Sequence, residues 1–211
     1  MQFTQNFFNP EIREGFEISA MMKRAWAAQM EVLQVVADIC KKNGLQYFAD
    51  WGTLLGAVRH QGFIPWDDDI DICLKREDYN RLISILPKQL PHGFVMAGMY
   101  AGTERLRLAA EVPQLRVMAD ETLWDFNDYM KYFHGFPYQR AGIDIFPLDY
   151  IPKEDELADI QKIMIKQGTN LLGNWTMLES EGKLEESLHA YEKLCNVRID
   201  RQWDVKNCLW N

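Results

Sequence analysis

The feature that most constrains this chain is a run of aspartates set into an alternating, apolar segment. Four of the five residues from 67 to 71 are aspartates, and the exception is Ile70. Because side chains two positions apart share one face of a strand, the alternation predicts a strand from Asp69 to Leu74. Asp69 and Asp71 then point to one face, about 7 Å apart, while the isoleucines beside them point into a core.

Two carboxylates on one face repel each other unless a cation lies between them. Oxygen-only ligands suit hard divalent cations, so Asp69 and Asp71 predict a site for Mg²⁺ or Mn²⁺. A solvated acidic turn is the alternative. An EF-hand calcium loop is excluded, because its sixth position would be Ile72 instead of Gly and its twelfth would be Asp78 instead of Glu.

A second apolar segment also carries a carboxylate. The segment from Gly142 to Asp149 predicts a strand in which Asp144 stands between two isoleucines. Since burying an unpaired charge is very costly, Asp144 needs a partner. If this strand lies beside the first, Asp144 becomes a third carboxylate of the metal site. The alternative is that Asp144 pairs with an arginine, and Asp149 could serve as a turn cap.

The remaining pattern predicts an α/β (α+β) fold, with a mixed sheet flanked by helices and a helical C-terminal portion. The division is expected near residue 152, which gives a catalytic core from 1 to 152 and a helical region from 153 to 211. Segment 120–141 is rich in aromatics and is expected to be irregular. Apolar periodicity predicts helices at 17–42, 54–58, 76–86, 156–178 and 184–209, and strands at 45–51, 69–74, 94–100, 113–119 and 143–151.

Composition excludes several classes of protein. The net charge of −8 argues against a nucleic-acid binder, whose affinity would depend on Lys and Arg. No apolar run approaches the roughly 20 residues of a transmembrane helix, and the N-terminal residues do not have the pattern of a secretory signal. The four cysteines are scattered without metal-ligand spacing, which favours reduced thiols. We therefore expect a cytoplasmic protein.

Two blocks of sequence resemble one family. Residues 52–71 read GTLLGAVRHQGFIPWDDDID, and residues 143–149 read IDIFPLD. The first block closely resembles the signature of the LicD family of phosphocholine and related phospho-alcohol transferases, to which fukutin-related proteins are akin. The second block resembles that family's second motif. The likeness runs from about residue 20 to about residue 155.

The resemblance implies a nucleotidyltransferase fold with named site residues. Gly52 and Thr53 would receive phosphate at a helix start, where backbone N–H groups favour anions. The carboxylates of Asp69, Asp71 and Asp144 would hold Mg²⁺ or Mn²⁺ against the donor phosphates. Asp144 would accept the proton of the attacking hydroxyl or share a second metal. Three basic residues are further candidates for binding phosphate or nucleotide: Arg59, His60 and Arg116.

In the family the donor is typically a CDP-linked alcohol such as CDP-choline, and the acceptor is a sugar of a cell-surface glycan. A quaternary ammonium group would favour aromatic rings, for which Trp51, Trp66, Trp124 and Tyr138 are candidates. Relatives usually continue into a further block with a Tyr-Gly-Asp-like element. Either this chain is truncated before that block or this member lacks it.

Three functions remain open on the sequence. The first is transfer of a phospho-alcohol from a CDP-linked donor to a glycan, which releases CMP. The second is nucleotidyl transfer, in which a nucleoside monophosphate moves and pyrophosphate leaves. The third is a non-catalytic nucleotide- or metal-binding module. The carboxylates cannot separate the first two, because both reactions use the same metal site, but the released product can.

Overall fold

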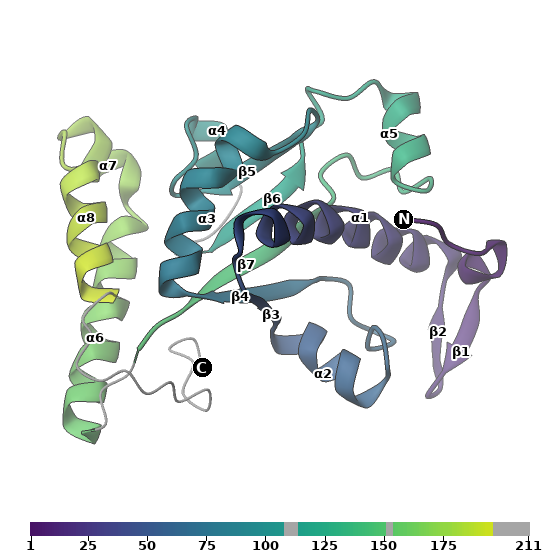
Figure 1. Cartoon of the computed structure of the whole chain (residues 1–211), viewed down its shortest axis with the longest axis horizontal. Coiled ribbons are helices and arrows are strands. Elements are labelled where there is room, and N and C mark those ends of the chain that lie inside the picture. Colours follow the sequence, from purple (N-terminus) through teal and green to yellow (C-terminus); the bar gives the residue numbers. More distant parts are fainter. Residues whose placement is uncertain (108–113, 151–153, 196–211) are drawn as a thin grey trace.

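A five-stranded mixed sheet lies at the centre of the computed structural model, which describes residues 1–107, 114–150 and 154–195 (Figure 1). The strand order is β3-β4-β7-β6-β5. β4 and β7 are parallel, and every other neighbouring pair is antiparallel, so the predicted mixed α/β sheet is confirmed. The strands are β3 (Tyr47–Ala49), β4 (Asp71–Lys75), β5 (Phe94–Gly98), β6 (Leu115–Ala119) and β7 (Gly142–Leu148).

Two long helices supply the layer that packs on this sheet (Figure 1). α1 (Ala20–Asn43) is capped at its N-terminus by Ser19, whose side chain accepts a hydrogen bond from the backbone N–H of Met22. It ends at Gly44, whose φ of 62° is the left-handed conformation that glycine adopts without penalty. α3 (Arg76–Gln89) follows β4 directly and contacts β4, β5 and β7. The sequence places both helices correctly, apart from residues at their ends.

Alternation along β4 and β7 decides which face of the sheet is buried. Ile72 and Leu74 of β4 and Ile143 and Ile145 of β7 belong to one apolar core with residues of α1 and α3. Each is at most 2% exposed. Full burial of such a side chain stabilises the fold by about 1.5–3 kcal/mol. The intervening residues of these strands, including both aspartates, therefore point to the opposite face.

The N-terminal residues form structure that the sequence patterns did not predict. A short 3-10 helix, η1 (Gln5–Phe8), precedes a hairpin of β1 (Glu11–Arg13) and β2 (Phe16–Ile18). The hairpin turns at Glu14 and Gly15, which both have positive φ. The alternation on either side of this turn is the usual signal for a hairpin, and three-residue strands give only a weak version of it.

Three short helices interrupt the chain between strands: α2 (Trp51–Arg59), α4 (Glu104–Arg107) and α5 (Phe126–Tyr132). The predicted strand at 45–51 is shorter than expected, because α2 already begins at Trp51. α5 lies in the segment that was expected to be irregular. The predicted end of α3 at Pro87 was also wrong, since the helix continues to Gln89 although Pro87 has no N–H to donate within it.

The predicted helical C-terminal portion comprises α6 (Asp155–Leu172), α7 (Trp175–Ser180) and α8 (Leu184–Cys195). These three helices pack against one another (Figure 1). They enclose a second apolar cluster, which also includes Met99 after β5. The proposed division at residue 152 and the predicted helix beyond Cys195 lie outside the described residues. Among the helices that the structure describes, none combines the length and the apolar character needed to cross a bilayer.

A buried ion pair joins the start of α3 to the end of β7. Nε of Arg76 donates to Oδ1 of Asp149 at 2.6 Å, and Nη2 donates to Oδ2 at 2.8 Å. Both side chains are 0% exposed. Burial opposes the charge on Arg76, but the hydrogen bonds and the charge of Asp149 raise the pKa of the guanidinium. Asp149 is therefore the partner of an arginine, where the sequence suggested a turn cap.

Breaking this pair from one side should destabilise the fold strongly. Arg76→Met leaves Asp149 buried without its cation, which should lower the free energy of unfolding by about 3–5 kcal/mol. The double variant Arg76→Met/Asp149→Leu should recover most of that loss, because no charge is left buried. Urea denaturation of both variants and wild type measures the difference. Equal losses in the single and double variants would contradict this prediction.

Candidate functional site

The register of three adjacent strands brings the predicted acidic and basic residues together. Asp71 of β4 lies directly opposite Asp144 of β7 in the parallel pair. Asp144 also lies opposite Arg116 of β6 in the antiparallel pair. Because side chains on directly paired positions share a face, these three residues stand side by side across the sheet. Two carboxylates predicted from separate segments of the sequence are therefore neighbours.

Asp69 reaches the same region from a loop. β4 begins at Asp71, so the predicted strand from Asp69 was two residues too long. At the start of β4, the N–H of Asp71 donates to the hydroxyl of Thr53 at 2.8 Å, and the N–H of Asp50 donates to the carbonyl of Asp71 at 3.0 Å. Asp69 nevertheless remains close to the strand, since its charge acts on Asp71 more strongly than that of any other residue.

Asp71 has the most perturbed carboxylate of the site. Burial and the charges of Asp69, Asp144, Asp50 and Asp67, in that order, raise its pKa to about 7. Each of these effects disfavours the charged form. The sequence motif included Asp67 only as part of the acidic run, and Asp50 was not predicted. Its position just before α2, where aspartate is a common helix cap, is the signal that could have identified it.

Asp144 is close to a cation as well as to other carboxylates. Its Oδ1 lies 3.2 Å from Nε of Arg116, so the pairing with an arginine that the sequence allowed is present beside the carboxylate cluster. Burial raises the pKa of Asp144, while Arg116 and a hydrogen bond from Gln114 partly offset that increase. Both Oδ1 of Asp144 and Nε of Arg116 are buried and make no hydrogen bond of good geometry.

Gly52 and Thr53 lie in the first turn of α2, where the sequence had suggested a break before the helix. Asp50 caps this helix, since its carboxylate accepts from the N–H of Trp51. A Cβ on Gly52 would lie 2.1 Å from Oδ2 of Asp67, so only glycine permits this approach of the carboxylate. Thr53 acts structurally through its bond to Asp71, which ties the start of α2 to the start of β4.

Asp67, Asp68 and Asp69 form the one cluster of potential metal ligands found among the residues that the structure describes. One ligand oxygen from each lies within 4.8 Å of the others. Burial, and then the charges of its neighbours and a hydrogen bond with Asp69, raise the pKa of Asp67. Together with Asp71 and Asp144, this cluster makes the region strongly electronegative and able to attract a divalent cation.

Arg59 and His60 lie at the other end of α2 from Asp50. Nε of Arg59 donates to Nδ1 of His60 at 3.3 Å, and Nε2 of His60 lies 3.2 Å from Oε2 of Glu14. Arg59 is exposed, whereas the side chain of His60 is 2% exposed. The two residues therefore contact each other and the N-terminal hairpin, and a role in binding phosphate or nucleotide stays a prediction.

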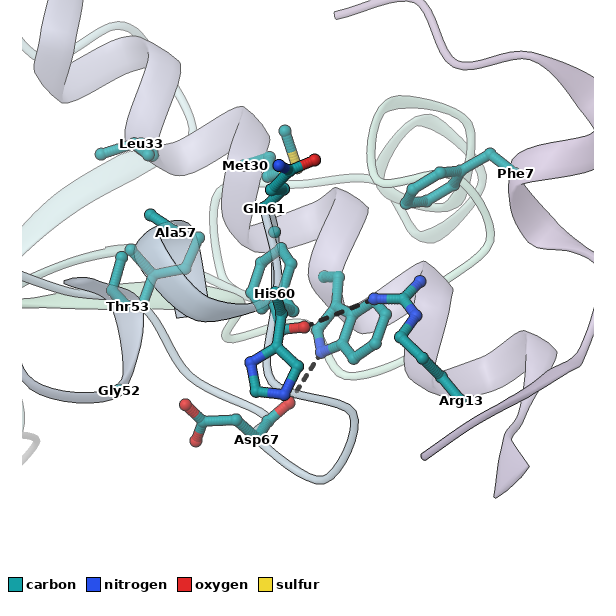
Figure 2. Close-up of a pocket in the computed structure, with 14 residues that line it drawn as sticks. Phe7, Arg13, Met30, Leu33, Gly52, Thr53, Ala57, His60, Gln61 and Asp67 are labelled. Atoms are coloured by element: carbon teal, nitrogen blue, oxygen red, sulfur yellow. Dashed lines mark hydrogen bonds between the residues drawn. The ribbon is translucent and has the colours of Figure 1, made fainter. Parts of the chain in front are cut away.

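Among the residues that the structure describes, two cavities border the acidic loop, which is residues 60–70 between α2 and β4. The larger, of about 830 Å³, lies beside Gly52, Thr53 and Asp67 and is mostly apolar (Figure 2). Figure 2 shows Phe7 and Arg13 on one side of it and Thr53 and Ala57 on the other, with His60 between them. A parallel stack of Trp26 on Phe63, with ring centroids 4.7 Å apart, contributes to the lining.

The smaller cavity, of about 570 Å³, is a cleft that contains the carboxylates Asp68, Asp69 and Asp144 and the guanidinium groups of Arg116 and Arg140. Carboxylates and cations therefore line the same space, as a site for a metal and a phosphate would require.

Of the four candidate rings for an ammonium group, Tyr138 lines this cleft and is 60% exposed. Trp51 and Trp66 are exposed, at 46% and 52%. Trp124 belongs instead to the aromatic packing around Phe94, and its Nε1 donates to the carbonyl of Gly93 at 2.7 Å. Tyr138 is therefore the candidate that lines the cleft together with Asp68, Asp69 and Asp144.

Comparison with known proteins gives short but consistent matches. The chain is 41% identical over 56 residues to the lipopolysaccharide cholinephosphotransferase LicD of Haemophilus influenzae, which covers 26% of this chain and 21% of that protein. It is 42% identical over 67 residues to an uncharacterised protein of Rickettsia prowazekii, over 32% of this chain and 25% of that protein. With human ribitol 5-phosphate transferase FKRP it shares 39% identity over 51 residues, 24% of this chain and 10% of that protein.

The chain thus aligns with a quarter or less of the length of each of these relatives. A family model covers much more of it. The model described as the LicD/FKTN/FKRP nucleotidyltransferase domain matches residues 44–163, more than half of the 211 residues. That range includes Gly52, Asp71, Arg116 and Asp144, which the sheet and α2 bring together. The resemblance seen in the sequence is confirmed, and the chain belongs to the LicD family.

Proposed function

We propose that this chain carries the catalytic centre of a metal-dependent phosphotransferase of the LicD type. It would move a phosphocholine-like phospho-alcohol from a CDP-linked donor to a hydroxyl of a cell-surface glycan. The printed names of two relatives support transfer of this kind, since one is a cholinephosphotransferase and the other a ribitol 5-phosphate transferase. The observation that carries the proposal is the direct pairing of Asp71 with Asp144 inside the region that matches the family.

The chemistry of the site fits a hard divalent cation, Mg²⁺ or Mn²⁺. The candidate ligands Asp69, Asp71 and Asp144 offer only carboxylate oxygens, which such ions prefer. Oδ1 of Asp144 is buried and makes no hydrogen bond of good geometry, although Nε of Arg116 lies 3.2 Å away. The charges around Asp71 mutually repel. When bound, such a cation would neutralise negative charge on the donor's diphosphate.

Other residues of the chain would bind and orient the donor. Gly52 and Thr53 lie in the first turn of α2, where the helix dipole and backbone N–H groups favour a phosphate. Arg116 lines the cleft with Asp144, and a guanidinium can hold phosphate oxygens in a bidentate manner. Arg140 lines the same cleft, with its Nε and Nη2 already paired to the carboxylate of Glu121. Tyr138 at the same cleft offers a ring face to a quaternary ammonium group.

Asp144 is the candidate for accepting the proton of the attacking hydroxyl. Burial raises its pKa, which brings the carboxylate closer to the range of an effective general base. The charge of Arg116 partly offsets that rise. Asp144 lies beside Asp71, so the hydroxyl and the donor phosphate would be held at neighbouring positions.

Removing the charge of either carboxylate should slow transfer strongly and leave the fold intact. Asp71→Asn and Asp144→Asn keep the side-chain shape but remove the charge, so we expect turnover to fall by roughly a hundredfold or more. The control is Asp159→Asn, because Asp159 is a 73% exposed carboxylate on α6. The assay follows release of CMP from CDP-choline with a glycan acceptor.

The released product also separates the alternative functions. Pyrophosphate released from CTP, without CMP release from CDP-choline, would replace the proposal with nucleotidyl transfer. No turnover of either donor with a panel of glycan acceptors would favour a binding module. Full activity of Asp71→Asn would exclude the proposed role of this carboxylate.

Divalent cations should stabilise the wild-type chain against unfolding. A ligand that binds only the folded state at a hundredfold excess over Kd adds about 2.7 kcal/mol. We expect millimolar Mn²⁺ to raise the melting temperature of wild type and to leave that of Asp71→Asn nearly unchanged. Differential scanning calorimetry measures both shifts. An equal increase in the two proteins would place the bound ion elsewhere.

The raised pKa of Asp71 should make metal-free stability fall as pH rises. Its carboxyl ionises at the ordinary value of 3.8 in the unfolded chain and at about 7 in the folded chain. Between these values the folded state binds more protons, so the free energy of unfolding decreases with increasing pH. Asp71→Asn should be as stable as wild type near pH 3.8 and more stable above about pH 7. Urea denaturation in metal-free buffer tests this, and a pH-independent difference would contradict it.

A further inference from the structure

Helix α1 holds the acidic loop between α2 and β4 by two consecutive backbone carbonyls. Nε1–H of Trp26 donates to the carbonyl of Asp67 at 2.8 Å. Nε2–H of Gln29, three residues further along the helix, donates to the carbonyl of Asp68. Residues three apart lie on the same side of a helix, one above the other, so the loop runs alongside α1. The indole of Trp26 also stacks on Phe63, which belongs to the same loop.

The other end of the loop is fixed by different elements. The N–H of Asp144 on β7 donates to the carbonyl of Ile70 at 3.0 Å. The N–H of Asp71 donates to Thr53 on α2 at 2.8 Å. The backbone is therefore held at residues 67 and 68 and again at 70 and 71, and Asp69 lies between these two attachments.

The hydrogen bonds from α1 also act against electrostatic repulsion among the carboxylates of the loop. Asp67, Asp68 and Asp69 carry ligand oxygens within 4.8 Å of one another, and their charges repel. Asp67 is also pressed against the backbone at Gly52. A loop under this repulsion relaxes outward unless its backbone is held. The bonds from α1 oppose that relaxation in the metal-free chain.

Gln29 would be an unfavourable residue at a position that served only to pack the core. It is 8% exposed, and its Oε1 is buried without a hydrogen-bond partner. Burying an unsatisfied polar atom is unfavourable, and an apolar side chain of the same size would avoid that cost. What a leucine could not provide is the N–H that reaches the carbonyl of Asp68. Gln29 also lines the cleft that contains Asp69 and Asp144.

We propose that Trp26 and Gln29 are positioning residues, which hold the Asp67–Asp69 segment and so preorganise the candidate ligand Asp69 for a divalent cation. This inference rests on the proposed function, because it concerns the same metal site. Neither residue is a ligand: each acts through a backbone carbonyl of the loop. The cation then binds to carboxylates that are already gathered, and less free energy is spent on ordering them.

The test compares metal affinity with stability in Gln29→Leu, Trp26→Phe and wild type. Mn²⁺ binding to the full chain is measured by isothermal titration calorimetry, and stability by urea denaturation in chelator. Losing one hydrogen bond should raise the Kd for Mn²⁺ by roughly three- to tenfold in each variant. Gln29→Leu should at the same time be at least as stable as wild type, because it removes a buried unsatisfied atom. A purely structural role would not move affinity and stability in opposite directions.

Val36→Ala is the matched control. Val36 is fully buried on α1, two turns beyond Gln29, and belongs to the main apolar core. It should lose stability and keep the wild-type affinity for Mn²⁺. Unchanged affinity in both Gln29→Leu and Trp26→Phe overturns the inference and leaves the proposed function standing. An equal loss of affinity in Val36→Ala also overturns it. A wild-type chain that binds no Mn²⁺ overturns this inference and the proposed metal dependence together.

Discussion

The parallel pairing of β4 with β7 is the constraint on which the candidate site depends. Burial of Ile72, Leu74, Ile143 and Ile145 contributes about 1.5–3 kcal/mol for each side chain, and it fixes which face of both strands meets the core. A slip by one residue would bury Asp71 and expose the isoleucines, so the register is strongly specified. The core therefore places the carboxylates of Asp71 and Asp144 side by side, although these charges repel each other.

The chain balances this repulsion locally. Arg116 stands across from Asp144, and the acidic loop is held by hydrogen bonds that α1 and β7 donate to it and by one that the N–H of Asp71 donates to α2. These contacts keep the carboxylates in place but do not neutralise them, as the raised pKa of Asp71, about 7, indicates. A cluster with this imbalance is less stable than an apolar surface would be. That is the usual sign of a site shaped for binding instead of for stability.

The C-terminal helices have their own apolar cluster and pack near the ends of β4 and β7. Arg76 begins α3 immediately after β4, and its buried pairing with Asp149 joins this point to the end of β7. The two strands that carry the carboxylates are thus also linked beyond their last residues. Burial raises the pKa of the Tyr191 phenol on α8, and the charges of Arg76 and Asp149 also act on it, so the helical portion packs where the two strands end. The match to the family reaches residue 163 and so extends into α6.

The sequence by itself determined the strands with isoleucine-flanked aspartates, the two long helices and the family, because hydrophobic alternation and an ungapped motif are local signals. It did not determine that Asp69 precedes its strand, that Asp149 pairs with Arg76, or that Gly52 is required by the approach of Asp67. Nor did it indicate Trp26 and Gln29, which look like ordinary positions of an amphipathic helix. Each of these depends on residues far apart in the chain, and only tertiary packing brings the side chain of one segment against the backbone of another.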